Sequence, residues 1–253
     1  MTVLVEDVGC VRVLTIDRQD RRNALSPATA DALRGGIERA ESDGTGAVVL
    51  TGAGGHFSAG GDADAILGVA ADADDGAPTA LMRTFHRLVE TVWNSPLPVV
   101  AAVSGVAFGG AFNLALACDL VFCSADARFC QVFLRRGVVP DVGGAYLLPR
   151  LVGMQRAKEL MLLAPEIDAA RAYRLGLVNE VLPDAPTTRS RAVEIAALLA
   201  DGPRSAIAAT KRMVNTGTAG SLHDALQLEA VSQAAALRTE AARDGFAPFL
   251  ESR

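Results

Sequence analysis

Two stretches of small residues constrain the fold most strongly, because each follows a short and continuously apolar run. Residues 56–62 (HFSAGGD) come after the run at 47–51, and residues 105–113 (GVAFGGAFN) come after the run at 98–103. Short apolar runs without polar alternation are typical of strands buried on both faces of a parallel sheet. A glycine-rich turn after such a strand can present bare backbone N–H groups to a ligand.

Strand and helix patterns alternate around these two loops. Period-two alternation predicts a strand over 11–16, and Ser26 followed by Pro27 predicts the cap and first turn of a helix. A second helix is expected over 79–94, where apolar residues recur at helical spacing. Alternating buried strands and helices predict an α/β architecture with strand–helix crossovers.

After about residue 152 the strand signal fades, and the segments that follow favour helices. We therefore expect an α/β core over residues 1–195 and a helical C-terminal region over residues 196–253. The chain has 253 residues, half of them hydrophobic, which is enough for one large core.

Charge and composition exclude several classes of function. A formal net charge of -5 and the absence of a basic tract argue against nucleic-acid binding. No apolar run is long enough to span a membrane, and the amino terminus lacks a leader pattern, so we expect a cytoplasmic protein that does not bind membranes. The four cysteines form no CxxC pair and the three histidines are scattered, so we expect no metal site.

Two backbone N–H groups aimed at one oxygen form an oxyanion hole, and losing one donor costs about 2.7–4 kcal/mol of transition-state stabilisation. Gly110 is expected near the start of a helix that runs through Leu116, where the helix dipole favours negative charge. The alternative is that both glycine clusters are simply tight turns. Either cluster alone leaves the two interpretations about even, but the pair favours a binding site.

Four ordered blocks resemble the crotonase superfamily, the enoyl-CoA hydratase/isomerase family, over nearly the whole chain. They are residues 20–25 (DRRNAL), 57–62, 104–120 and 136–153. The resemblance implies a ClpP/crotonase-like spiral of ββα units with a helical C-terminal trimerisation region. It also implies a homotrimer or dimer of trimers, and an acyl-CoA thioester as substrate. Coenzyme A would enter as part of that substrate, and no separate cofactor is expected.

The resemblance assigns roles to particular residues. It implies that the N–H groups of Ala59 and Gly110 hold the thioester carbonyl oxygen. The residues implied to bind the coenzyme are Arg22, Ala24, Ala59, Gly60, Gly61, Asp62 and Gly110. Of these, Ala24, Ala59, Gly61 and Asp62 would line the adenine and pantetheine channel, largely through backbone groups. Arg22 and its neighbour Arg21 would approach phosphates, although a solvated arginine pair is an equal alternative. Asp62 has an alternative role as the cap of a short helix that begins near residue 63.

The sequence departs from the hydratases of this family at both of their catalytic glutamates. Asn113 stands at the first position and Phe133 at the second. An amide cannot shuttle protons near neutral pH and a phenyl ring cannot bind water, so water addition by two carboxylates is disfavoured.

Asp141 is the acid that stands near the expected acyl pocket instead. Together with Asn113 it resembles the branch that isomerises enoyl- and epoxy-CoA thioesters in phenylacetate-type degradation. One carboxylate suffices to remove a proton from one carbon and return it at another, so we expect an enoyl-CoA isomerase with catalytic residues Ala59, Gly110 and Asp141. The alternatives are a hydratase with atypical water activation and a non-catalytic acyl-CoA binding protein. Asp141 could also simply cap the helix that follows it.

Overall fold

The computed structural model describes residues 2–70, 76–217 and 220–251. Its centre is a six-stranded sheet with the order β1-β2-β3-β4-β6-β9, in which β1 is antiparallel to β2 and the later pairs are parallel. The strands of this sheet are β1 (Val3–Val8), β2 (Val11–Ile16), β3 (Ala47–Gly52), β4 (Val99–Val103), β6 (Leu120–Ser124) and β9 (Glu180–Leu182). A smaller sheet has the order β5-β7-β8, with β5 (Val106–Phe108), β7 (Arg128–Cys130) and β8 (Ile167–Asp168).

Helices connect the strands and cover both faces of the large sheet. Those before the second sheet are η1 (Gln19–Arg21), α1 (Pro27–Ser42), α2 (Ala63–Ala70), α3 (Ala77–Asn94) and α4 (Gly110–Ala117). Those after it are η2 (Leu134–Arg136), α5 (Gly144–Leu162), α6 (Ala169–Arg174), α7 (Ala185–Ala200), α8 (Arg204–Gly217), α9 (Leu222–Ala236) and α10 (Glu240–Glu251).

Residues of each central strand alternate between two apolar layers. In β3, Val48 and Leu50 pack into a layer with α1 and α3, whereas Ala47 and Val49 pack against α7 on the other face. All four side chains are fully buried. Burial on both faces explains why the sequence of this strand is uniformly apolar.

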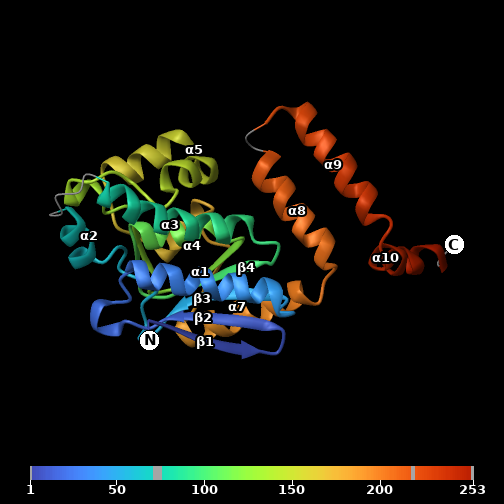
Figure 1. Ribbon diagram of the computed structural model, residues 1–253, viewed down its shortest axis with the longest axis horizontal. Helices are drawn as coiled ribbons and strands as arrows, with labels where there is room; N and C mark the ends of the chain where they lie inside the picture. Colours follow the sequence, from blue (N-terminus) through green and yellow to red (C-terminus); the bar gives the residue numbers. More distant parts are fainter. Residues whose placement is uncertain (1, 71–75, 218–219, 252–253) are drawn as a thin grey trace.

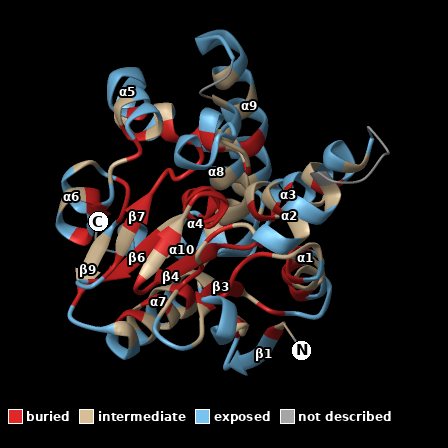
Figure 2. Cartoon of the chain, turned by 90° about the vertical axis from the view of Figure 1, so that its left-hand side faces the viewer, coloured by how far each residue is buried: buried red, intermediate tan, exposed pale blue. Residues whose placement is uncertain are grey.

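Helix α4 is buried along its entire length and lies at the centre of the molecule, as Figure 2 shows by its red colour. It packs between α3, α5 and the short strand β5. A helix enclosed in this way has no solvent-facing side, which accounts for its nearly uniform apolar sequence.

The predicted strand over 11–16 and the helix that Ser26 caps are both confirmed: the Ser26 Oγ accepts from the Thr29 N–H, and α1 runs to Ser42. The expectation that strands end near residue 152 is wrong for β8 and β9, which are only two and three residues long. The predicted boundary between residues 195 and 196 falls inside α7, which packs on the sheet up to Ala200.

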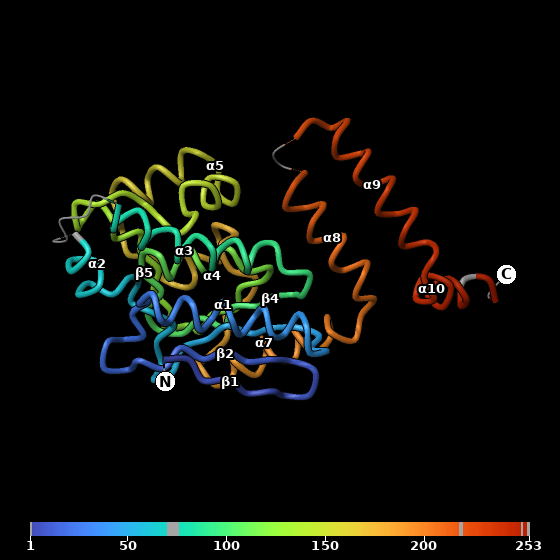
Figure 3. The backbone as a smooth tube through the Cα atoms, in the orientation of Figure 1, coloured from blue at the N-terminus to red at the C-terminus, as the bar shows by residue number. Residues whose placement is uncertain are grey.

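The last three helices extend away from the sheet, as the orange-to-red part of Figure 1 and the tube in Figure 3 show. Helix α8 is attached to the body through Lys211, whose Nζ donates to the carbonyls of Val92 and Leu97 and pairs with Asp119 at 2.8 Å. Asn215 adds a hydrogen bond to the Trp93 carbonyl. Among the described residues, no helix is both long and apolar enough to cross a membrane.

Candidate active site

The two glycine-rich loops lie side by side, joined by backbone hydrogen bonds. The Ser58 N–H donates to the Val106 carbonyl at 2.9 Å, and the Phe108 N–H donates to the Ser58 carbonyl at 3.1 Å. The first loop follows β3 and the second contains β5, so neighbouring parallel strands deliver both loops to one edge of the sheet. The sequence-based expectation that the two loops form one site agrees with this geometry.

Gly110 presents one free amide at this edge. Gly109 adopts a positive φ of 54° and donates its own N–H to the Cys130 carbonyl, and α4 begins at the next residue. A Cβ atom built on Gly110 would lie 2.8 Å from Val142 Cγ2 and 3.3 Å from Asp141 Oδ1. Glycine therefore lets the first amide of α4 stay accessible while the turn at 141–142 packs directly against it.

The second free amide belongs to Gly61, which corrects the expectation for Ala59. The Ala59 N–H donates to the Arg22 carbonyl at 2.9 Å, so it is already used within the protein. The chain then reverses at Gly60, whose φ is +95° and whose N–H is bonded to Ser58 Oγ. Within the described part of the chain, the amides of Gly61 and Gly110 have no hydrogen-bond partner.

A cavity of about 270 Å³ opens beside these two amides. Its apolar lining comes from α2, α3 and the segment around β7 and η2, namely Ala63, Ile66, Leu67, Met82, Phe85, Val132, Phe133, Val138 and Val142, with Leu25 from the loop before α1. Asp141 and Arg136 are its charged lining residues. A mostly apolar cavity with a few convergent polar groups is typical of a small-molecule site.

Asp141 places a carboxylate next to the Gly110 amide. Its Oδ1 is buried and has no hydrogen-bond partner among the described residues. Burial raises the pKa of this carboxyl to about 6, and the opposing influence of the His86 charge is smaller. A carboxyl group with that pKa can take up and release a proton near neutral pH.

The alternative interpretation of Asp141 as a helix cap does not agree with the geometry. The N-cap residue of α5 is Gly143, and no side chain caps this helix. It is the backbone carbonyl of Asp141 that accepts the Gly144 N–H, at 2.9 Å. The carboxylate is thus left facing the cavity.

Asn113 and Phe133, which stand at the positions of the hydratase glutamates, both lie close to Asp141. Asn113 is fully buried on α4 and donates from Nδ2 to the Asp141 carbonyl at 2.8 Å. Phe133 is 5% exposed and lines the cavity. Neither side chain brings a second carboxylate to the site.

Of the residues expected to contact the coenzyme, Asp62 has another role. Its Oδ1 accepts from the N–H groups of Asp64 and Ala65 at the start of α2, and its Oδ2 pairs with Arg18 at 2.7 Å. The capping alternative for Asp62 is therefore correct, and both carboxylate oxygens are occupied.

The other expected coenzyme contacts lie near the first loop, and they differ in exposure. Arg22 is exposed, has a φ of 47° and makes no side-chain hydrogen bond or ion pair among the described residues, whereas Arg21 is paired with Asp64 at 2.7 Å. Ala24 is buried beneath them, and Gly60 lies against the Phe108 carbonyl. Arg22 is thus the cation of the pair that is available to a phosphate.

Sequence reasoning did not identify Asn23 as a structural residue of the site. Its buried side chain donates to the carbonyls of Ala53 and His56 and accepts from the Arg18 N–H. These bonds fix the turn before Ala24 against the first loop, and the asparagine itself has a positive φ of 59°. Asparagine tolerates that conformation, which is the signal that could have identified it.

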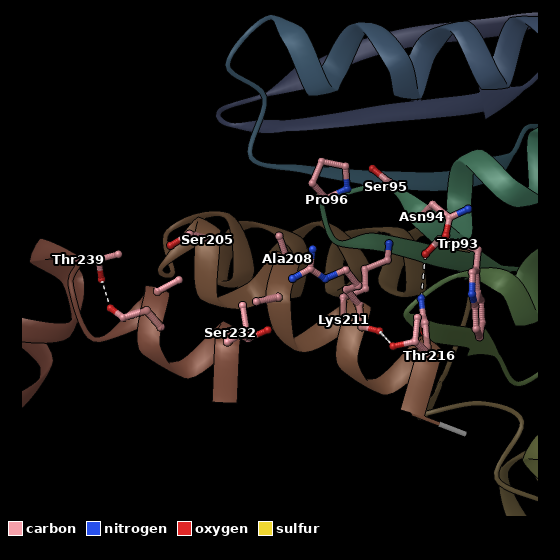
Figure 4. A pocket seen from close by; sticks show the side chains of 16 residues that line it. Trp93, Asn94, Ser95, Pro96, Ser205, Ala208, Lys211, Thr216, Ser232 and Thr239 are labelled. Carbon is pink, nitrogen blue, oxygen red and sulfur yellow. Dashed lines mark hydrogen bonds between the residues drawn. The ribbon is translucent and has the colours of Figure 1, made fainter. Parts of the chain in front are cut away.

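A larger cavity of about 700 Å³ lies between the end of α3 and the helices α8 and α9, as Figure 4 shows. Lys211 lies in it, but its ammonium group is committed to the hydrogen bonds that hold α8. None of the residues predicted for catalysis or coenzyme binding lines this cavity.

Comparison with known proteins identifies the family of this chain. The family described as enoyl-CoA hydratase/isomerase matches residues 6–253. A probable enoyl-CoA hydratase of Rhodobacter capsulatus is 39% identical, with 100% of this chain and 96% of that protein covered. A 1,2-epoxyphenylacetyl-CoA isomerase of Escherichia coli is 34% identical, with 96% of this chain and 93% of that protein covered.

Solved structures show the same fold. The crystal structure of an enoyl-CoA hydratase from Polaromonas sp. JS666 superposes with a TM-score of 0.94 at 31% identity, over 99% of this chain and 97% of that one. The expected crotonase-like α/β fold is thereby confirmed. The chain belongs to the enoyl-CoA hydratase/isomerase family, the crotonase superfamily.

Proposed function

We propose that this protein is an enoyl-CoA isomerase that moves a carbon–carbon double bond through an enolate. The observation that carries the proposal is the juxtaposition of the buried, unpartnered Oδ1 of Asp141 with the free amide of Gly110. A base and an anion-stabilising donor in one apolar cavity are the two groups that proton transfer beside a thioester requires.

The reaction conserves all atoms and needs no oxidant or water. The thioester oxygen accepts hydrogen bonds from the Gly61 and Gly110 amides. The Asp141 carboxylate removes a proton from carbon, and the C–H electron pair is delocalised onto the thioester oxygen. The protonated Asp141 then returns that proton to a different carbon of the conjugated system, and the double bond shifts. Because the substrate neither gains nor loses electrons, no redox cofactor takes part.

Three features support isomerisation over hydration. Asn113 and Phe133 replace the acids that would activate water, the cavity wall beside Asp141 is apolar, and one relative carries the name of an isomerase. The names of other relatives favour the alternative, a hydratase with atypical water activation. A non-catalytic acyl-CoA binding protein is the third candidate, and the pKa of Asp141 near 6 argues against it.

The test compares a β,γ-unsaturated acyl-CoA with crotonyl-CoA as substrates of the wild-type protein and of Asp141→Asn. We expect isomerisation by the wild type, little water addition, and loss of isomerisation in the variant. Asp201→Asn, an exposed carboxyl at the end of α7, is the matched control and keeps full activity. Hydration faster than isomerisation would favour the hydratase, and tight binding without turnover would favour the binding protein.

Assembly and location also belong to this proposal. We propose a homotrimer or dimer of trimers in the cytoplasm, built through the C-terminal helices. These helices expose large apolar side chains, among them Leu226 at 49%, Val231 at 69% and Leu250 at 69%. Sedimentation analysis of the purified protein measures the oligomeric state directly.

A further inference from the structure

A buried pair of amide side chains lies directly behind the Asp141 turn. Gln131 Nε2 donates to Asn113 Oδ1 at 2.7 Å, and Asn113 Nδ2 donates to the Asp141 carbonyl at 2.8 Å. Asn113 is fully buried and Gln131 is 1% exposed. The two residues come from α4 and from the segment just after β7, so the pair joins separate elements to the turn.

The order of donors and acceptors in this pair is fixed. Because the Asn113 oxygen accepts from Gln131, its NH₂ group faces the Asp141 carbonyl, which can only accept. A carboxylate at position 113 would put two acceptors against each other. The asparagine is therefore suited to this contact in a way that an aspartate or glutamate is not.

The turn that the pair contacts has an unfavourable backbone conformation. Val142 has a φ of +49°, a region that β-branched residues rarely adopt, and Gly143 follows at +75°. A Cβ atom on Gly144 would lie within 2.3–2.6 Å of the Asn113 amide atoms, so that amide packs against the Gly144 backbone. The Asp141 carbonyl thus receives hydrogen bonds from both Asn113 and the Gly144 N–H.

We propose that Asn113 and Gln131 are positioning residues that hold the strained Asp141–Val142 turn and thereby keep the Asp141 carboxylate buried beside Gly110. This inference rests on the proposed function, in which Asp141 is the base. Without the two side-chain hydrogen bonds, Val142 relaxes towards a negative φ and the carboxylate moves towards solvent. The base then loses both its alignment with the substrate and the desolvation that sets its proton affinity.

The test removes the more distant donor with Gln131→Met, which keeps the side-chain length and leaves Asn113 in place. We expect kcat for isomerisation to fall by about 10²-fold with KM little changed, because a displacement of about 1 Å can have that effect on rate. The acid limb of the pH–rate profile moves from about 6 towards lower pH. His86 and Arg136 are the other charged groups near this carboxyl, and both stay in place.

A direct readout does not depend on turnover. The ¹³C-carboxyl resonance of Asp141, assigned by its loss in Asp141→Asn, is titrated in the wild type and in Gln131→Met. A lower apparent pKa in the variant is expected. Val142→Gly, which removes the strain at positive φ, is expected to restore part of the lost kcat when combined with Gln131→Met.

The control is Thr188→Val, which removes the hydrogen bond from the buried Thr188 hydroxyl to the carbonyl of Asp184, the N-cap residue of α7. This bond is remote from the cavity, so we expect no change in kcat or in the titration. If Gln131→Met leaves both the rate and the Asp141 titration unchanged while Asp141→Asn is inactive, the positioning role is refuted and the proposed function stands. If Asp141→Asn keeps full isomerase activity, it is the proposed function that fails. A fall in kcat with no shift in the titration also overturns the positioning role.

Discussion

The substitution Gly110→Ala tests whether the close approach of α4 to the Asp141 turn is needed for catalysis. The added methyl group would lie 2.8 Å from Val142 Cγ2, a separation that real Cβ contacts do not show, and 3.3 Å from Asp141 Oδ1. Val142 is 3% exposed and cannot rotate away, so the turn itself must shift. A shift approaching 1 Å costs about 10²-fold in rate.

The same substitution has a small effect on stability. Alanine is the better helix former by about 0.5–1 kcal/mol, whereas overpacking a dense region costs about 1–3 kcal/mol. The net loss in the free energy of unfolding is therefore about 2.5 kcal/mol or less, and the protein stays folded at room temperature.

The assay measures kcat and KM for isomerisation and, separately, unfolding by denaturant. Gly245→Ala on α10 is the matched control, because its added methyl group meets no atom within 4 Å. We expect the control to keep the wild-type kcat and to gain at most about 1 kcal/mol in the free energy of unfolding. Gly110→Ala is expected to lose about 10²-fold in kcat. A Gly110→Ala variant with wild-type kcat would refute the reasoning, as would one in which KM alone changed.

Two further predictions concern buried charges. Because the folded-state pKa of Asp141 is raised to about 6, wild-type activity falls as the pH drops through 6. For the same reason Asp141→Asn stabilises the fold above pH 6 by at most about 3 kcal/mol, and this gain disappears below about pH 4. Denaturant unfolding of both proteins at pH 8 and at pH 4 measures the difference. Lys211→Met removes the ion-pair partner of the Asp119 carboxylate, whose side chain is 23% exposed and which keeps only the hydrogen bond from the Val99 N–H. We expect a loss of about 1–3 kcal/mol in the free energy of unfolding and faster proteolysis between α7 and α8. The exposed Lys158→Met is the control.

The strands that sequence predicted well are those buried on both faces. The apolar runs that form β3 and β4 predict strands clearly, because both faces of these strands are buried and successive side chains must therefore all be apolar. β1 gives no such signal: five of its six residues are exposed, since it is an edge strand with one partner. β9 is too short for periodicity to be detectable.

Within the site, the local sequence predicted an accessible amide at Gly110, and the family resemblance placed Asp141 near the expected acyl pocket. A glycine at the first turn of a helix predicts an accessible amide. The structure adds the burial that raises the pKa of Asp141. The roles of Asn113 and Gln131 could not be predicted in this way. They depend on contacts between residues 18 and 28 positions apart, and on a positive φ at Val142 that its residue type disfavours.

The assignment of the second amide to Gly61 rather than Ala59 leads to the last prediction. Two features decide which N–H faces the cavity. The chain reverses at Gly60, and the Ala59 N–H donates to the carbonyl of Arg22, a residue distant in sequence. Replacing one backbone amide at a time by an ester removes a single N–H and leaves every side chain unchanged.

The ester at Gly61 is expected to lower kcat by about 10²–10³-fold with little change in stability. In the proposed mechanism that amide donates to the substrate oxygen, and it has no partner among the described residues. The ester at Ala59 is expected to lower stability by about 0.5–1.5 kcal/mol, the usual net value of one hydrogen bond, with kcat nearly unchanged. Stopped-flow or steady-state rates and denaturant unfolding of the two esters separate these effects. The amide that stabilises the developing negative charge must be the one whose removal slows the reaction. If the Ala59 ester, and not the Gly61 ester, has the lower kcat, Ala59 is the donor and the assignment to Gly61 is wrong.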